Sequence, residues 1–280
     1  MNIDSLLIDR IIALAFEEDI QTGDITTNSI IPEEQQYMAS LTMKADGVIS
    51  GLSVAKKVFE YLGKPVEWQA YFKDGDKVKR GDLIAEVKAD YRVLLQMERT
   101  ALNFLQRMSG IATATSKFVE AVKGTKTRIL DTRKTAPGLR VLDKMAVHHG
   151  GGLNHRMGLF DMVMLKDNHI KAAGGITEAV ASVRENLPLS IRIEVETSNL
   201  DQVREALASN VDIIMLDNMD NQTMSEAVRL IGHRAKTEAS GNMTIDRVAE
   251  VAAVGVDYIS VGALTHSVKA LDISMNFKNI

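Results

Sequence analysis

The stretch IRIEVETSNLDQVREALASNVDIIMLDN, residues 191–218, decides the fold. It opens with an apolar run that reaches Glu196 and closes with a second apolar run that reaches Asp217. The residues between these runs, 199–209, have the apolar spacing of a helix with one buried face. A strand, a helix and a second strand in this order predict two parallel strands joined by a crossover helix.

The same alternation repeats after Lys126. Six apolar runs each end in a polar residue or glycine: RILDTRK (128–134), DMVMLKD (161–167), IRIEVET (191–197), DIIMLDN (212–218), AKTEASG (235–241) and DYISVGA (257–263). This pattern predicts an α/β fold with a parallel sheet. Six units are fewer than the eight of a complete barrel, so we predict an incomplete parallel α/β barrel of six or seven strands. A doubly wound open sheet is the alternative, although the runs lack the glycine fingerprint of a dinucleotide site.

The first part of the chain follows a different pattern. Helical spacing at 3–16 predicts an opening helix, and short β-like runs separated by turn dipeptides follow at 23–91. Residues 94–122 are again helical, with a predicted break at Ser109 and Gly110. The chain is therefore divided into an N-terminal α+β sandwich domain (1–109), a barrel domain (110–265) and a C-terminal segment that returns to the N-terminal domain (266–280).

Composition limits the classes of function. With 280 residues, 45% hydrophobic, the chain can bury an ample core. A net charge of -4 argues against a surface built to bind nucleic acid. The absence of cysteine excludes disulfides, thiolate metal sites and cysteine nucleophiles. The early apolar run at 11–16 is too short for a signal peptide or a membrane span, so we expect a cytoplasmic protein without a membrane partner.

The ends of the predicted strands carry three kinds of residue. In a parallel barrel the functional groups lie at the carboxyl ends of the strands. Here the ends are first cationic, then acidic, then small: Arg133 and Lys134, Lys166, Glu196, Asp217, Ser240 with Gly241 and Asn242, and Gly262. The cations, together with Arg156, are interpreted as a convergent anion clamp, because guanidinium groups suit planar carboxylates.

The other two zones suit a metal and a phosphate. Glu196 and Asp217 end neighbouring strands and could both bind Mg²⁺ through oxygen. An acid/base pair is the rival role, but carboxylates near a metal and several cations should stay ionised. The loop at 240–242 precedes a helix and, with Gly262, suits a phosphate; a glycine at a simple turn is the competing interpretation.

Basic residues outnumber acidic ones near the cationic zone. Between Arg128 and Lys171 there are eight Lys or Arg against four Asp. We interpret Arg140 and Lys144 as members of a solvated helix face, because isolated helix charges are usually exposed.

Seven motifs along the chain together resemble those of the quinolinate phosphoribosyltransferases: ERTALNFLQRMSGIAT (98–113), DTRKTAPGLR (131–140), GGLNHRMGLFDMVMLKDNHI (151–170), IEVE (193–196), IMLDN (214–218), EASGN (238–242) and VGALTHS (261–267). The early EEDIQTGDITT (17–27) is also similar to a motif of that family, so the resemblance covers nearly the whole chain. DTRKTAPGLR and LNHRMGLFDMVMLKDNH are the most specific of these motifs.

The resemblance implies transfer of phosphoribose from 5-phosphoribosyl 1-pyrophosphate (PRPP) to quinolinate, with decarboxylation. The products are nicotinate mononucleotide, pyrophosphate and CO₂, in the de novo synthesis of NAD, and the implied cofactor is Mg²⁺. It further implies that the quinolinate carboxylates face Arg133, His155, Arg156 and Lys166. Catalysis is assigned to Lys134, Lys166, Glu196 and Asp217, of which Glu196 and Asp217 hold the metal. The remaining implied substrate contacts are Arg99, Thr132, Ser240, Gly241, Asn242, Val261, Gly262, Ala263 and His266.

Arg99 lies on the helix before the predicted barrel. In the resembled family the equivalent arginine enters the active site of the partner subunit, which implies a homodimer with a shared Arg99; a higher oligomer stays open. A helix-surface arginine that pairs with Glu98 is the simpler interpretation from the sequence alone.

Two other classes of function compete. KADGVISG with DGDKVKRGDLIAEV is similar to lipoyl and biotin carrier domains, but Lys44 precedes the turn instead of occupying its tip. A barrel lyase or isomerase could act on a sugar phosphate through a Schiff base at Lys166.

Overall fold

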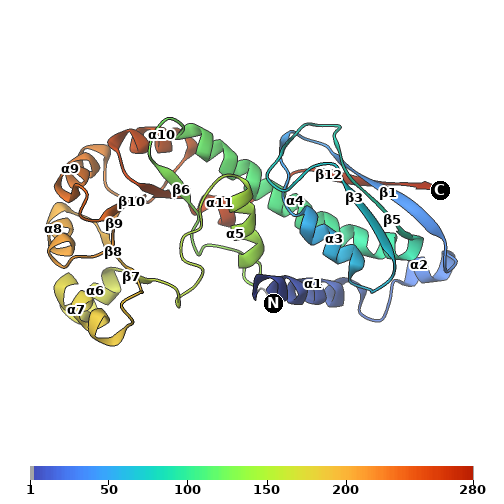
Figure 1. The fold of residues 1–280 in the computed structure, drawn as a ribbon, viewed down its shortest axis with the longest axis horizontal. Helices are drawn as coiled ribbons and strands as arrows, with labels where there is room; N and C mark the ends of the chain where they lie inside the picture. Colours follow the sequence, from blue (N-terminus) through green and yellow to red (C-terminus); the bar gives the residue numbers. More distant parts are fainter. Residues whose placement is uncertain (1–2, 280) are drawn as a thin grey trace. The chain divides into compact units, whose positions relative to one another are not determined.

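The computed structural model describes residues 3–279, which form two compact units (Figure 1). Unit 1 comprises the chain up to Ser116, the segment Thr135–Gly151 and the chain from Thr265. Unit 2 comprises Lys117–Lys134 and Gly152–Leu264. Relative to the predicted division at 109 and 265, the segment Thr135–Gly151 therefore belongs to the unit that contains the N-terminal sheet.

Unit 2 is built on a six-stranded parallel sheet, and all six predicted runs are strands. The strands are β6 (Arg128–Leu130), β7 (Val163–Leu165), β8 (Ile193–Thr197), β9 (Ile213–Asp217), β10 (Lys236–Ser240) and β11 (Tyr258–Ser260). Their order is β6-β11-β10-β9-β8-β7, so each strand from β7 to β11 lies beside its successor, and β6 lies beside β11. This order lacks the reversal that characterises a doubly wound sheet.

Helices connect these strands and lie on their outer side (Figure 1). They are α6 (Asp167–Ala173), α7 (Ile176–Asn186), α8 (Leu200–Ala208), α9 (Asn221–Ile231) and α10 (Ile245–Val254). The last three begin at N-cap side chains, Asn199, Asp220 and Thr244, each of which accepts a hydrogen bond from a backbone N–H three residues on. A cap of this kind stabilises a helix by about 1 kcal/mol, so the local sequence sets where each crossover starts.

Unit 1 contains a four-stranded antiparallel sheet in the order β12-β1-β5-β3. Its strands are β1 (Gln36–Met43), β3 (Val66–Ala70), β5 (Leu83–Asp90) and β12 (Ile273–Asn279), and β2 (Gly47–Val48) pairs separately with β4 (Lys77–Val78). The C-terminal segment thus adds an edge strand to β1, in the register Leu41↔Met275. The helices are α1 (Ile3–Ile20), α2 (Ile25–Ile30), α3 (Leu52–Glu60), α4 (Tyr91–Ala121) and α5 (Arg140–His149); α11 (Ala263–His266) spans the return from unit 2.

The predicted break at Ser109 and Gly110 is wrong, because α4 is continuous through both residues. Glycine is required there for packing. A Cβ at Gly110 would overlap the carbonyl oxygen of Lys269, which lies against the helix. Ser109 also has a tertiary partner, since its hydroxyl donates to the carbonyl of Ser50 and accepts from the Ser50 N–H. The residues that suggest a turn are instead the points where other segments approach the helix closely.

The expectation that Lys144 lies on a solvated face is also wrong. Lys144 is 1% exposed and the adjacent Asp143 is fully buried on the same helix, α5. Asp143 accepts hydrogen bonds from Nε and Nη2 of Arg107, both at 2.8 Å. A bidentate pair of this kind offsets the desolvation of the carboxylate, so α5 buries charged residues against α4.

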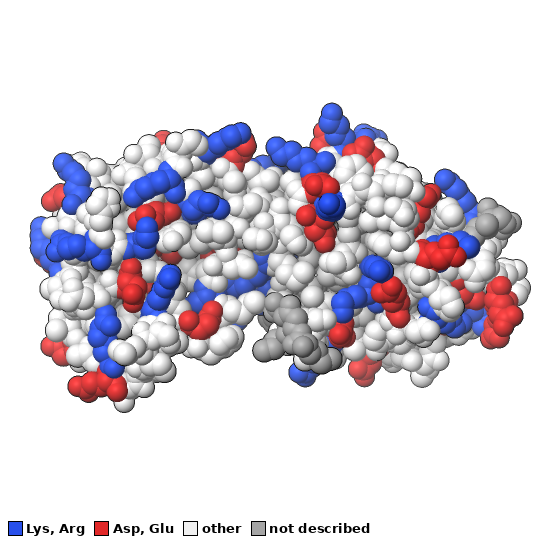
Figure 2. All heavy atoms as spheres, viewed as in Figure 1, with Lys and Arg blue, Asp and Glu red and all other residues white. Residues whose placement is uncertain are grey.

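Charges of both signs are interspersed on the face shown in Figure 2. This agrees with the small net charge and differs from the single-sign stripe of a nucleic-acid-binding surface. None of the helices within residues 3–279 combines the length and apolar character needed to cross a bilayer.

Gly110 offers a test of the packing of α4. Glycine to alanine inside a helix normally stabilises a protein by about 0.5–1 kcal/mol. For Gly110→Ala we expect the opposite sign, a loss of about 1–3 kcal/mol in the free energy of unfolding, because the new methyl meets the backbone near Lys269. Chemical denaturation followed by circular dichroism measures this, with Ser182→Ala on the exposed face of α7 as the control. A stabilised Gly110→Ala would contradict the close approach.

Candidate active site

Two arginines of unit 2, Arg133 and Arg156, lie near each other. Arg133 follows β6, and its Nε is buried with no hydrogen-bond partner among the described residues. Arg156 donates from Nη1 to the carbonyl of Met162 at 3.1 Å. Burial lowers the pKa of Arg156, and the positive charge of Arg133 lowers it further. Two partly desolvated guanidinium groups, one with an N–H that lacks an acceptor, are well suited to bind an anion.

A third cation lies at the end of β7, where Lys166 is the N-cap residue of α6. Its Nζ is 3.2 Å from Oε2 of Glu196, which lies on the neighbouring strand β8. The two side chains are 48% and 20% exposed, so this ion pair is accessible to solvent. Lys166 and Glu196 therefore meet at the carboxyl edge of the sheet, as predicted for the ends of parallel strands.

Asp217 ends β9, directly opposite Ser240 on β10. Its Oδ2 accepts a hydrogen bond from Nδ2 of Asn218 at 2.7 Å, and the Asn218 N–H donates to the carbonyl of Ser240 at 3.0 Å. Asn218 adopts a left-handed backbone conformation with φ 53°, and Gly241, with φ 97°, packs directly against it. The acidic residue and the small-residue loop thus form one connected structure.

Arg247 of α10 hydrogen-bonds to both the loop after β9 and the loop after β10. Its Nη1 donates to the carbonyl of Gly241 at 3.1 Å and its Nη2 to the carbonyl of Met219 at 3.0 Å. Asn242, the next loop residue, is exposed with φ 49°. One guanidinium group therefore ties the loop after β9 to the loop after β10, a connection that sequence reasoning did not predict.

The last predicted residues of unit 2 lie beside β6. The N–H of Val261 donates to the carbonyl of Leu130 at 2.9 Å, so Gly262 and Ala263 follow at the same edge as Thr132. The hydroxyl of Thr132 accepts the N–H of Lys134 at 3.0 Å, which orders the start of the cationic loop. Because β6 lies beside β11, the predicted cationic residues after β6 and the small residues after β11 lie at neighbouring strand ends.

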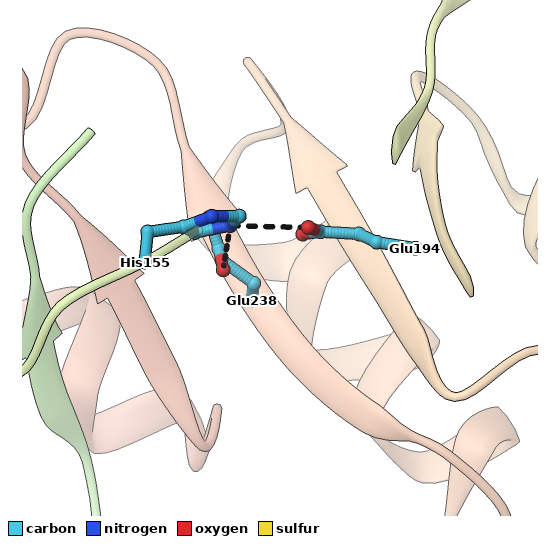
Figure 3. A group of neighbouring side chains, drawn as sticks. All are labelled: His155, Glu194 and Glu238. Carbon is cyan, nitrogen blue, oxygen red and sulfur yellow. Dashed lines mark ion pairs between the residues drawn. The ribbon is translucent and has the colours of Figure 1, made fainter. Parts of the chain in front are cut away.

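His155 lies in the irregular segment between α5 and β7, and its ring faces two buried carboxylates on strands of the sheet (Figure 3). Its Nε2 is 3.0 Å from Oε2 of Glu194 and 3.2 Å from Oε2 of Glu238. The histidine side chain is 6% exposed and both glutamates are fully buried. Glu194 belongs to β8 and Glu238 to β10, so two strands that are not neighbours supply the pair.

The opposite ring nitrogen has a backbone partner. The N–H of Arg156 donates to Nδ1 of His155 at 2.7 Å, which requires a lone pair on Nδ1. The ring therefore carries its first proton on Nε2, between the carboxylates. Burial lowers the pKa of His155, whereas the charges of Glu194 and Glu238 raise it. The N–H of Arg156 opposes a second proton on the ring, because that proton would occupy the Nδ1 lone pair. Burial and the charge of Glu238 raise the pKa of Glu194 to about 7.

His155, Glu194 and Glu238 are also the group of three potential metal ligands found among residues 3–279, with ligand atoms within 4.8 Å of one another. A metal on Nε2 needs the lone pair that the proton occupies, and Nδ1 would then have to donate instead of accept. The Arg156 N–H directed at Nδ1 opposes that tautomer. The arrangement thus favours a shared proton over a metal ion.

Sequence reasoning missed Glu194 and Glu238, although both lie in stretches that the motifs include. The available signal was a charged residue inside an apolar strand, since carboxylates are almost never fully buried without a partner. Asp131 is a third such residue: it is fully buried, and its Oδ1 accepts the N–H of His155 at 2.9 Å.

Two predicted site residues belong to unit 1. Arg99 is exposed on α4; burial raises the pKa of the adjacent Glu98, and the charge of Arg99 opposes that shift. His266 is exposed, with Nδ1 2.7 Å from the hydroxyl of Ser267. Unit 2 brings together the cationic, acidic and small-residue zones. The substrate contacts of all the predicted site residues, Arg99 and His266 included, stay predictions.

A parallel α/β unit whose strand ends carry cations, carboxylates and a small-residue loop defines the architecture of an enzyme for anionic substrates. Residues 24–109 match the N-terminal domain and residues 111–276 the C-terminal domain of the family described as quinolinate phosphoribosyl transferase. The chain belongs to the quinolinate phosphoribosyltransferase family.

Named relatives cover almost the whole chain. A probable nicotinate-nucleotide pyrophosphorylase (carboxylating) from Bacillus subtilis is 44% identical over 97% of this chain and 93% of its own. A mitochondrial quinolinate phosphoribosyltransferase (decarboxylating) from Nicotiana tabacum is 46% identical over 96% of this chain and 81% of its own. The crystal structure of NadC from Streptococcus pyogenes is 43% identical, covers 98% of this chain and 97% of its own, and superposes with a TM-score of 0.94.

Gly241 allows the link between the two loops to be tested. In Gly241→Ala the new Cβ meets the side chain of Asn218 and the backbone has φ 97°, so we expect a loss of about 2–4 kcal/mol in the free energy of unfolding. Gly255→Ala is the matched control, because Gly255 has φ 93° and nothing within 4 Å of its added Cβ. It should lose only about 1–2 kcal/mol from backbone strain. Equal losses in urea denaturation would show that the contact with Asn218 is unimportant.

Proposed function

We propose that this chain transfers the phosphoribosyl group of PRPP to quinolinate and releases pyrophosphate and CO₂, leaving nicotinate mononucleotide. Support comes from relatives that are named quinolinate phosphoribosyltransferase (decarboxylating) and match over 96% of this chain. The structural observation that carries the proposal is the convergence of Arg133 and Arg156, with the Nε of Arg133 buried and lacking an acceptor. A planar dicarboxylate would satisfy that group by charge-assisted hydrogen bonds.

The cationic zone overcomes the repulsion between two anionic substrates. Arg133, Arg156 and Lys166 bind the quinolinate carboxylates, with Lys134 turned to the pyrophosphate side. A direct contact of His155 with quinolinate, through a side chain that is 6% exposed, stays a prediction. In a partly dry site these charges act more strongly than in water. Lys166 exchanges its partner Glu196 for substrate, which the 48% exposure of its side chain permits.

The reaction needs positioning more than covalent help from the protein. The pyridine nitrogen forms a bond to the anomeric carbon of the ribose while the bond to pyrophosphate breaks, and pyrophosphate leaves with the electron pair. The bond between C2 of the ring and its carboxylate then breaks, CO₂ leaves, and the electron pair stays on C2 until a proton is added. The neighbouring pyridinium nitrogen stabilises this pair, and Lys134 or Lys166 stabilises the same negative charge.

Mg²⁺ would be held by Glu196 and Asp217. Both are carboxylates at the ends of neighbouring strands, and the hydrogen bond from Asn218 orients the Asp217 oxygens. This donor set suits a hard cation. When bound, Mg²⁺ neutralises charge on the pyrophosphate. The 5-phosphate of PRPP is assigned to the loop at 240–242 with Gly262 and Ala263, where backbone N–H groups and small residues permit close approach.

The sheet of unit 2 is proposed to be an incomplete barrel. The segment around Leu153 pairs in parallel beside β6, and the chain then passes to β7 at the other edge of the sheet. In the strand order, Asp131, Glu238 and Glu194 follow or lie on every second strand, β6, β10 and β8. Side chains from alternate strands fill one interior layer in known barrels, which supports closure.

A homodimer with a shared Arg99 completes the proposal. Large exposed apolar side chains are present in both units, among them Ile25 and Ile30 in unit 1 and Leu159 and Phe160 in unit 2. Such surface residues favour association when they form a contiguous patch. A cytoplasmic location stays a prediction from the sequence.

A coupled assay tests the reaction. Purified protein with Mg²⁺, PRPP and quinolinate labelled in its 2-carboxylate should release CO₂ and pyrophosphate in equal amounts, whereas nicotinate in place of quinolinate should yield no labelled CO₂. Borohydride with candidate aldehydes should trap no adduct on Lys166, which separates this reaction from Schiff-base chemistry. Pyrophosphate release without CO₂ would contradict the proposed substrate.

Mixed subunits test the shared arginine. Arg99→Ala and Lys166→Ala are each expected to be inactive alone. If sites are shared, random mixing after unfolding and refolding should restore about a quarter of the wild-type activity, because half the dimers regain one intact site of two. Activity no greater than the sum of the separate variants would contradict sharing of Arg99.

A further inference from the structure

Three buried carboxylates converge on one residue, His155. Asp131 accepts its backbone N–H at 2.9 Å, and Glu194 and Glu238 lie 3.0 and 3.2 Å from its Nε2 (Figure 3). All three carboxylates are fully buried. The proposed reaction uses none of them, so their presence in the interior needs a separate explanation.

Burial of these groups carries a large desolvation cost. A buried carboxylate is tolerated when a charged or hydrogen-bonding partner compensates it, and here the compensating partner of Glu194 and Glu238 is the Nε2–H of His155. Neither oxygen of either glutamate has a hydrogen-bond partner of good geometry among the described residues, so the short contacts with Nε2 are the compensation that these carboxylates have there. Apolar side chains at these buried positions would avoid the desolvation penalty and stabilise the fold at least as well, so the carboxylates point to a role other than stability.

The two ends of the imidazole ring are held by different parts of the chain. Nε2 faces Glu194 and Glu238, whereas Nδ1 accepts the N–H of Arg156 at 2.7 Å. The ring thus transmits its orientation directly to the backbone of Arg156. That residue carries one of the two guanidinium groups of the proposed quinolinate clamp. Its Nη1 donates to the carbonyl of Met162 at 3.1 Å, and its Nη2 lies 3.7 Å from the sulfur of Met164.

We propose that Glu194 and Glu238 are positioning residues for quinolinate: by holding Nε2–H of His155 they fix the backbone of Arg156 and thereby the geometry of the clamp. This inference rests on the proposed function. It assigns a substrate-specific role, because PRPP is bound by other loops. The short contact of residue 238 with Nε2, more than the charge of residue 238, carries the effect.

Glu238 is the better residue to change, since Glu194 also acts on Arg156 directly through its charge. Glu238→Met keeps the volume and removes the acceptor, and Glu238→Gln keeps an acceptor and removes the charge. For Glu238→Met we expect the KM for quinolinate to rise about tenfold, with the KM for PRPP within about twofold of wild type. Glu238→Gln should stay within about threefold for both substrates.

The sign of the change separates positioning from simple electrostatics. Loss of a negative charge near an anion site strengthens anion binding by Coulomb's law, so a charge effect alone would lower the KM for quinolinate in both variants. Loss of positioning raises it in Glu238→Met. A fall, or an equal rise for both substrates, overturns the proposal.

A double-mutant cycle shows whether Glu238 acts through His155. In a His155→Gln background, Glu238→Met should raise the KM for quinolinate no further, because the intermediary is already lost. Additive effects contradict the inference. Nitrogen NMR of the histidines, with His155→Gln to assign the signal, should show a proton on Nε2 and none on Nδ1 in wild type, and the opposite tautomer would also contradict it.

Asp257 provides a matched control. It is a partly buried carboxylate of unit 2 that accepts from the N–H and the hydroxyl of Thr237 and pairs with Lys126 and Lys236, at the amino end of the strands. Asp257→Asn should lower the unfolding temperature without separating the two KM values. If wild type releases neither pyrophosphate nor CO₂, the proposed function fails; if wild type is active and Glu238→Met has unchanged KM values, only the positioning role fails.

Discussion

Parallel pairing of β8, β9 and β10 is the interaction on which the site depends. The ladders place Glu196 opposite Met215 and Asp217 opposite Ser240, so polar strand ends arrive at one edge of the sheet. Side chains two residues apart share a face of a strand. Glu194 therefore lies one step below Glu196, and Glu238 one step below Ser240, so that buried carboxylates lie beneath the carboxyl edge of the sheet.

The two levels have different electrostatic roles. At the carboxyl edge of the sheet, cations and carboxylates remain accessible to solvent, as in the pair of Lys166 with Glu196, whose side chains are 48% and 20% exposed. In the interior the carboxylates are shielded from bulk solvent, so their charge must be compensated within the protein. His155 approaches both glutamates with one ring nitrogen, at 3.0 and 3.2 Å, and so offsets part of the cost of glutamate at fully buried positions of β8 and β10.

Rigid loops complete the arrangement. Arg247 binds the carbonyls of Gly241 and Met219, and Asn218 connects Asp217 to Ser240. These contacts determine the loop geometry before a ligand arrives. Preorganisation of this kind reduces the ordering cost when a multiply charged substrate binds. The glycine at 241 is required by its neighbour as well as by its own backbone angle, because Asn218 occupies the space of a side chain.

The amino-acid sequence alone determined the six strand runs and the types of residue at the strand ends, since each depends on local periodicity and side-chain chemistry. It misjudged Gly110 and Lys144, which suggest a turn and a solvated surface by residue type but lie against distant segments. It also did not disclose the partnership of Asp131, Glu194 and Glu238 with His155. Only the tertiary structure decided these contacts. A buried charge, or a glycine against which another segment packs, depends on a partner that is distant in the sequence. No local pattern of residues identifies that partner.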